Sequence, residues 1–184
     1  MEELLADLTI NMEHSILETV QQGAAWENWY HIEIGKALAR AGHVVRREQS
    51  YPDKPRDELD LLVTYNGTTY AVEVKVESAK KPGYIWGDDQ LTAGFSYMGP
   101  NGQLERALGA GRGFIHISAD GQKVTRFSGA GKRLFVFVSH SDKVRTVMQD
   151  IANDGAAPPV TSRQGSRITV TVADADAYGF PEAQ

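Results

Sequence analysis

The sequence predicts a single α/β domain in which a mixed central sheet is flanked by helices. Two stretches of helical periodicity open the chain, a β-hairpin with an Asn-Gly turn follows, and an apolar strand later alternates with a further helix and strand. The 184 residues are 41% hydrophobic and 23% charged. This length and composition suit one core spanning residues 1–184 and are too apolar for a disordered chain.

The first two predicted elements are helices. Apolar side chains recur at three- and four-residue steps over about residues 3–22, with acidic side chains between them. We therefore expect an acidic amphipathic N-terminal helix that ends near Gly23. A second helix is expected over about residues 25–41, because aromatic and aliphatic residues recur at helical spacing and Gly42 supplies a stop. Glu33 lies on this second helix, beside its apolar stripe.

The clearest strands follow a short predicted strand at residues 43–48. Residues 58–65 and 69–77 alternate apolar and polar side chains on either side of Asn66 and Gly67. This dipeptide best tolerates the positive φ angles of a two-residue turn. We therefore expect an antiparallel hairpin here.

The remaining elements are less regular. A second hairpin is expected from residues 114–118 and 123–127, around a turn that contains Gly121. Residues 133–139 form an uninterrupted apolar run that is typical of a buried strand. A helix at 142–152 and a last strand at 167–172 complete the domain.

The composition excludes several classes of protein. There is no cysteine, so the chain has no disulfide framework, no thiolate zinc site and no cysteine nucleophile. Residues 1–20 contain no Lys or Arg and no long apolar run, which fits neither a secretory signal nor a transit peptide. No segment reaches the roughly 20 apolar residues of a membrane helix. We therefore expect a cytoplasmic protein with no membrane partner.

The charge is distributed unevenly along the chain. The whole protein has 24 acidic and 19 basic residues, but residues 36–149 hold 17 basic and 12 acidic ones. A locally basic middle permits a nucleic-acid partner despite the acidic pI of about 5.5. Such clusters are also common on ordinary solvated surfaces. The residues that we take as candidate phosphate contacts are Arg46, Arg47, Lys54, Arg56, Lys132 and Arg133.

The chemistry-bearing side chains lie on the first hairpin. In the strand 69–77 the valines alternate with Glu73, Lys75 and Glu77, which therefore share the face opposite the valines. Asp60 interrupts an apolar run on the partner strand, where an unpaired buried carboxylate would be costly. In the right register the hairpin brings Asp60 close to Glu73 and Lys75. Two carboxylates on adjacent strands are suitable ligands for Mg²⁺, and a neighbouring Lys can orient a water or stabilise charge on a phosphate.

The order of these residues resembles the PD-(D/E)xK nuclease superfamily, which has a restriction-endonuclease-like fold. Asp60 matches the first-strand aspartate of the motif, and Glu73 and Lys75 match its (D/E)xK pair. Glu33 matches the helical glutamate that many members add to the metal site, and Gln90 matches a glutamine that some members carry on the following helix. The similarity covers residues from about 26 to 90. The proline of the motif is absent, as in many relatives, because Leu59 precedes Asp60.

The resemblance implies a metal-dependent nuclease, with DNA as the expected substrate and RNA as an alternative. Asp60 and Glu73 would hold Mg²⁺, or Mn²⁺ as a substitute, with the Val74 carbonyl as a further ligand and Glu33 completing the shell. Lys75 would position the attacking water, and the metal would act as a Lewis acid. With one site per chain, we expect a homodimer for the cleavage of both strands of a duplex. Because two acids repel one another, the loss of Asp60 or Glu73 is expected to stabilise the metal-free protein.

Two interpretations stay open at this point. Glu73 and Lys75 also fit the solvent face of an ordinary hairpin, and a non-enzymatic member of the same fold would bind nucleic acid or a protein partner with vestigial acids. The presence of Asp60, Glu73 and Lys75 together favours the enzyme. The run from Ser139 to Asp142 contains the residue types of a hydrolytic triad, but sequential neighbours cannot form one.

Overall fold

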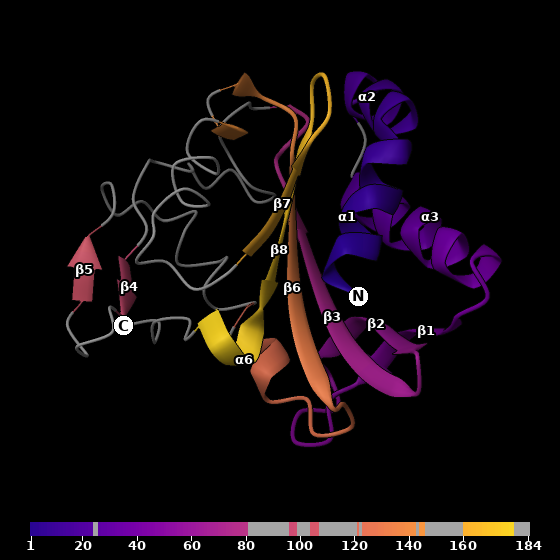
Figure 1. Ribbon diagram of the computed structural model, residues 1–184, viewed down its shortest axis with the longest axis vertical. Coiled ribbons are helices and arrows are strands. Elements are labelled where there is room, and N and C mark those ends of the chain that lie inside the picture. The colour runs from indigo at the N-terminus through magenta and orange to yellow at the C-terminus, as the bar shows by residue number, and fades with distance from the viewer. Residues whose placement is uncertain are drawn as a thin grey trace.

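The computed structural model describes residues 1–23, 26–80, 96–98, 104–106, 121, 123–142, 144–145 and 160–178. Its centre is a six-stranded mixed sheet in the order β1-β2-β3-β6-β8-β7 (Figure 1). The strands are β1 (Val44–Ser50), β2 (Glu58–Tyr65), β3 (Thr68–Val76), β6 (Lys132–Ser139), β7 (Val160–Gln164) and β8 (Thr169–Asp174). The β3–β6 pair is parallel and the other neighbours are antiparallel. The predicted α/β class with a mixed sheet is confirmed.

Three helices cover one face of this sheet (Figure 1). They are α1 (Glu2–Asn11), α2 (Glu13–Gln21) and α3 (Trp26–Arg40). The single N-terminal helix predicted over residues 3–22 is therefore two helices, broken at Met12, whose amide bonds to the Thr9 carbonyl three residues back. The helices and the sheet enclose the main core, in which the buried side chains of α3 pack against the valines of β3. Each such buried side chain contributes roughly 1.5–3 kcal/mol.

The second face carries a smaller core. Its buried side chains are Tyr51, Leu59, Ala71, Val124, Phe127 and Ala175. Residues 123–125 are helical, so the strand predicted at 123–127 is wrong. The physical reason is the three-residue step from Val124 to Phe127, which buries both side chains on one side of a helical turn. A short helix, α6 (Ala175–Tyr178), lies on the same side.

Several strands differ from the expected ones. The predicted strand at 167–172 is β8, shifted toward the C-terminus, and β7 at the sheet edge was not predicted. A separate two-stranded sheet pairs β4 (Ser96–Met98) with β5 (Leu104–Arg106). Residues 114–118 and most of the helix predicted at 142–152 lie outside the described residues. Within the part of the chain that the structure describes, no helix is long and apolar enough to cross a membrane.

The β2–β3 hairpin has a regular half and an open half. Asn66 and Gly67 have φ angles of 48° and 78°, as the predicted turn requires. From Tyr65–Thr68 to Leu61–Val72 the two strands pair residue by residue, but no pairing with β3 is recorded for residues 58–60. Leu61 belongs to the helix-side core and Leu59 to the second-face core, although strict alternation predicts one face for both. The backbone therefore changes its facing at Asp60, where the two strands part.

Strand β1 is distorted at the same level. Its register with β2 runs from Val44–Thr64 to Ser50–Glu58 but passes over the pair of Glu48 with Asp60. Glu48 has a φ of 54°, in the left-handed region that a residue with a Cβ atom rarely adopts. The sheet is thus irregular around Asp60 on both neighbouring strands.

Candidate active site

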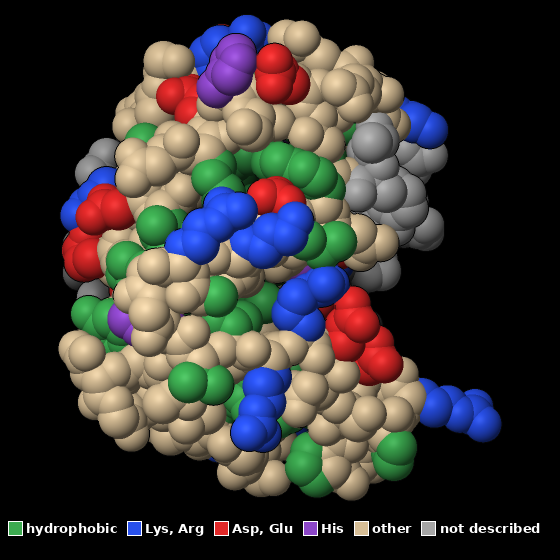
Figure 2. Space-filling view, turned by 90° about the vertical axis from the view of Figure 1, so that its right-hand side faces the viewer, with side chains coloured by type: hydrophobic (Ala, Val, Ile, Leu, Met, Phe, Trp, Pro, Cys, Tyr) green, Lys and Arg blue, Asp and Glu red, His purple; other side chains and the backbone are tan. Residues whose placement is uncertain are grey.

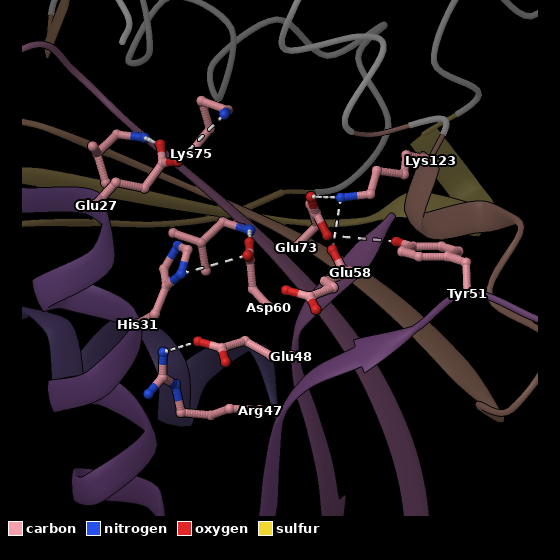
Figure 3. Close-up of polar contacts among 12 residues, drawn as sticks. Glu27, His31, Arg47, Glu48, Tyr51, Glu58, Asp60, Glu73, Lys75 and Lys123 are labelled. Atoms are coloured by element: carbon pink, nitrogen blue, oxygen red, sulfur yellow. Dashed lines mark hydrogen bonds and ion pairs between the residues drawn. The ribbon is translucent and has the colours of Figure 1, made fainter. Parts of the chain in front are cut away.

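Carboxylates replace the missing strand-to-strand hydrogen bonds at the opening of the hairpin (Figure 3). The Val74 amide of β3 donates to Asp60 Oδ2 at 2.7 Å. Two residues further on, the Val76 amide donates to Oε2 of Glu27, on the first turn of α3, at 3.3 Å. An unpaired backbone N–H at a partly buried sheet edge is costly, so these two acids stabilise the open edge of β3.

His31 packs against Asp60 from the helix side. Its Nδ1 lies 3.4 Å from Asp60 Oδ1, and its side chain is only 9% exposed. Burial lowers the pKa of His31 to about 4, although Glu27 opposes the shift. The ring is therefore neutral at pH 7 and Nδ1–H can donate to Asp60. Its Nε2 is buried and has no hydrogen-bond partner among the described residues.

Glu73, on β3, lies close to Asp60 of β2 (Figure 3). The partners of Glu73 lie on the side of the opening that is opposite to His31. Its side chain is 5% exposed, and its Oε1 lies 2.8 Å from Nζ of Lys123. The Tyr51 hydroxyl donates to Glu73 Oε2 at 3.5 Å. Burial and the charges of Glu73 and Asp60 raise the pKa of Tyr51, which keeps this hydroxyl protonated.

Lys75 extends toward α3 and meets Glu27. The Lys75 Nζ and Glu27 Oε1 atoms are 3.5 Å apart, and both side chains are less than a fifth exposed, at 16% and 19%. Burial raises the pKa of Glu27, and the nearby charge of Asp60 adds to the rise, while Lys75 and His31 oppose it. The opening thus holds three acids, two lysines and a neutral imidazole.

The sequence-predicted site is therefore assembled in part. Asp60, Glu73, Val74 and Lys75 come together at the opening. Glu33 does not join them: it forms an ion pair with Lys36, 2.7 Å away on the exposed side of α3. Because Glu33 follows His31 by two residues, it is turned from His31 by about 200° around the helix axis. The helical positions at the site belong to Glu27 and His31 instead, and Gln90 lies outside the described residues.

Glu27, His31, Tyr51 and Lys123 were missed by the sequence analysis. A signal existed for the first two, because Glu27 and His31 are four residues apart and directly follow the buried Trp26 and Tyr30. They therefore flank the stripe that α3 buries against the sheet. Nothing in the local pattern pointed to Tyr51 or Lys123, since both reach Glu73 only through the tertiary fold.

The two carboxylates expected to repel one another are each compensated. Asp60 receives the Val74 amide and faces His31, and Glu73 receives an ammonium and a hydroxyl. The sequence-based expectation was that loss of either acid stabilises the metal-free protein. Because both acids have partners, we instead expect their loss to destabilise it. Removal of Asp60 would leave the Val74 amide unpaired at the open edge, at a cost of about 1–3 kcal/mol.

The acid that directly follows β3, Glu77, has a structural role. It is fully buried, and its Oε2 accepts hydrogen bonds from the amides of His140 and Ser141 at 2.8 and 2.9 Å. The Ser141 hydroxyl donates to Glu77 Oε1 at 2.5 Å. Glu77 therefore joins the end of β3 to the chain that leaves β6, and the run from Ser139 to Asp142 does not form a triad.

The six basic candidates are placed differently. Arg46, Lys54, Arg56 and Lys132 are exposed, while Arg47 pairs with Glu48 at 2.7 Å. Arg133 donates to the Phe127 carbonyl and approaches Asp176 at 3.3 Å. Lys54 and Arg56 belong to the loop that follows Tyr51, at the open end of the hairpin, whereas Lys132 pairs with Tyr70 near the turn end. Lys and Arg side chains also gather in the middle of the face that lies to the right in Figure 1 (Figure 2).

The donor set suits a hard divalent ion. Asp60 and Glu73 offer carboxylate oxygens and Val74 a backbone carbonyl. His31 adds a buried nitrogen that has no partner within the described part of the chain. Carboxylate and carbonyl oxygens suit Mg²⁺, and an added imidazole also suits Mn²⁺. Among the described residues, however, no three His, Asp or Glu side chains converge closely enough to hold an ion as they lie. An ion bound here would require Asp60 or Glu73 to turn from its present partner.

Comparisons of the chain with models of protein families, with curated proteins and with solved structures find no match.

Proposed function

We propose that the protein is a metal-dependent nuclease of the PD-(D/E)xK type, with a restriction-endonuclease-like core. One observation carries the proposal: Asp60, Glu73 and Lys75 lie around the opening where β2 parts from β3, with the first turn of α3 at its edge. The chain order of helix, strand and hairpin, joined to a mixed sheet, supports the same fold.

The roles follow from the positions. Asp60 and Glu73 would hold Mg²⁺ or Mn²⁺ together with the Val74 carbonyl, and His31 would fix Asp60 or contribute its buried nitrogen. The ion would supply Lewis-acid stabilisation of the charge that develops on the phosphate. Lys75 is placed to orient the water that attacks phosphorus as the bond to the leaving sugar oxygen breaks. Its contact with Glu27 keeps the ammonium at the edge of the opening.

DNA is the proposed substrate, with Lys54 and Arg56 as phosphate contacts beside the opening and Arg46 on the neighbouring strand. Their exposure leaves them accessible to a backbone phosphate. For double-strand cleavage we propose two copies of the chain, each cutting one strand. Light scattering on a protein that still cuts duplex DNA would decide the oligomeric state.

The decisive experiment is a cleavage assay on plasmid, linear duplex, single-stranded DNA and RNA with Mg²⁺, Mn²⁺ or EDTA. We expect cleavage that depends on the metal and is lost in Glu73→Gln and Lys75→Met. Glu18→Gln is the matched control, because Glu18 is 60% exposed on α2 and forms an ion pair with His14 on the same helix. Equal activity of Glu73→Gln and the wild type would overturn the assignment.

A second function has one observation in its favour. Each acid at the opening already has a protein partner, so the site is stable without a metal. This suits a nuclease-fold module that binds nucleic acid without cutting it. Metal-independent binding of DNA, with no cleavage under any condition of the assay, would favour this alternative.

A further inference from the structure

Lys123 occupies a cation position at the opening. Its Nζ lies 2.8 Å from Glu73 Oε1 and 2.8 Å from the carbonyl oxygen of Glu58. The ammonium also lies 5.2 Å from the centre of the Tyr51 ring, and its side chain is 20% exposed. Lys123 is therefore a well-enclosed lysine with specific partners.

The two oxygens that bind the ammonium come from the two strands that part. Glu58 is on β2, two residues before Asp60, and Glu73 is on β3 (Figure 3). A carboxylate and a backbone carbonyl are also the oxygen types that bind hard metal ions. Lys123 thus bridges the opening with a single positive charge, where a bound metal ion would use the same carboxylate.

A metal ion and this ammonium cannot both keep their full interaction with Glu73. Like charges a few ångströms apart repel strongly in a site that is largely shielded from water. A divalent ion on Glu73 must therefore displace Lys123 or bind more weakly in its presence. Lys123 has a long and flexible side chain, so displacement needs no change of the backbone.

We propose that Lys123 is a built-in competitor of the divalent ion, which neutralises Glu73 in the metal-free protein and is displaced when the ion binds. This inference rests on the proposed metal site at Glu73. Lys123 would then determine how tightly the site binds a metal ion. Its ammonium also explains why the Glu73 carboxylate, which is only 5% exposed, is stable before the ion binds.

The first test measures Mn²⁺ binding to the protein without nucleic acid, from the electron paramagnetic resonance signal of free Mn²⁺. We expect Lys123→Met to bind at least about tenfold more tightly than the wild type. Lys36→Met is the matched control: it removes the same charge from a lysine that is 53% exposed and pairs with Glu33, and its affinity should stay within about twofold. Unchanged or weaker binding by Lys123→Met overturns the competition.

Glu73→Gln separates this inference from the function on which it rests. If the wild type binds Mn²⁺ through Glu73 and Lys123→Met gains nothing, only the competition is wrong. If Glu73→Gln does not reduce Mn²⁺ binding, or if no Mn²⁺ binding is found at all, the proposed metal site is wrong, and the nuclease proposal and the competition fail together.

A second test uses the wild type alone and does not depend on the folding of a variant. Lysines are acetylated briefly with an amine-reactive ester, with and without Mn²⁺, and the modification of each is measured by mass spectrometry. We expect saturating Mn²⁺ to raise the labelling of Lys123 at least about threefold and to leave Lys36 unchanged, because an ion-paired ammonium is a poor nucleophile. Equal labelling of Lys123 in both conditions overturns the displacement.

Discussion

The two ends of the β2–β3 hairpin use different means to satisfy the same backbone groups. At the turn end, Tyr65 pairs with Thr68 and the strands bond to one another through Leu61 and Val72. At the open end, the amides of Val74 and Val76 bond to side-chain carboxylates of Asp60 and Glu27. The turn end requires only a tight turn and alternating side chains. The open end also requires acidic side chains, which come from β2 and α3.

This difference shows how a reactive site can be built into a stable sheet. Opening a ladder exposes amides, and carboxylates placed there to bind them are concentrated at one point. The acids thereby serve the fold and remain available for a metal ion. Mutations at the turn end should therefore alter stability alone, and mutations at the open end should alter stability and activity in separable ways.

The largest effect is expected for Asp60→Asn. The amide oxygen can still accept the Val74 hydrogen bond, so the fold should persist, but a neutral ligand should lower the cleavage rate by about 100- to 1000-fold. Asp60→Ala should show the same loss of activity and also lower the free energy of unfolding by about 1–3 kcal/mol, because the Val74 amide loses its partner. Cleavage rates and urea unfolding in EDTA measure the two effects. Equal stability of the Asn and Ala variants would contradict the structural role.

The second effect is a pH dependence that originates at His31. Its pKa is about 4 in the folded protein against 6.5 in a model peptide. Between these values the unfolded chain binds a proton that the folded chain does not. The free energy of unfolding should therefore fall by about 3 kcal/mol as the pH drops from 6.5 to 4, an effect that is absent above pH 6.5.

His31→Asn tests this dependence, because Asn can still donate to Asp60 but does not titrate. The raised pKa of Glu27 has the opposite effect: it lowers the free energy of unfolding as the pH rises above the ordinary pKa of a glutamate. Glu27 is present in both proteins, so this contribution should be similar in the two. Urea unfolding of the two proteins in EDTA should give a shallower pH dependence for the variant between pH 4 and 6.5. Parallel curves would show that His31 does not titrate as a buried neutral group.

The sequence predicted the parts of this site that depend on local patterns. The Asn66-Gly67 turn fixed the hairpin, and the alternation of β3 placed Glu73 and Lys75 on the same strand face. The change of facing at Asp60 was not predictable, because it lies opposite the left-handed backbone of Glu48 on another strand, and no local pattern shows either irregularity. Glu33 was assigned through the family resemblance and Glu27 was missed, because a helical pattern shows which side of a helix is buried but not which residues border the sheet opening.

The third prediction compares the two helical glutamates. Glu27→Gln should lower cleavage by about tenfold, because it weakens the anchor of Lys75 and one hydrogen bond to the open strand edge. Glu33→Gln breaks an ion pair between the partly exposed Glu33 and the exposed Lys36 on α3, worth less than about 1 kcal/mol, and should cleave normally. Single-turnover rates at saturating Mn²⁺ distinguish the two. A larger loss of activity for Glu33→Gln would indicate that Glu33, as the sequence resemblance implied, is the helical glutamate of the site.

The fourth prediction concerns the turn end. Gly67 has a φ of 78°, which a residue with a Cβ atom adopts at a cost of about 1–2 kcal/mol. Gly67→Ala should lower the free energy of unfolding by this amount and leave the Mn²⁺ affinity unchanged. Urea unfolding and metal titration of the same sample measure both. A changed metal affinity would mean that the two ends of the hairpin are coupled.

The smallest effect is expected for Glu48→Gly, at the distorted position opposite Asp60. Glycine adopts a φ of 54° without the penalty of a Cβ atom, so the substitution should raise the free energy of unfolding by about 0.5–1 kcal/mol. The side chain of Glu48 is 61% exposed and its ion pair with Arg47 adds little, so its loss should not cancel the gain. Glu48→Val, which is β-branched, should destabilise the protein instead. If glycine also destabilised the protein, the left-handed backbone at this position would not be a source of strain.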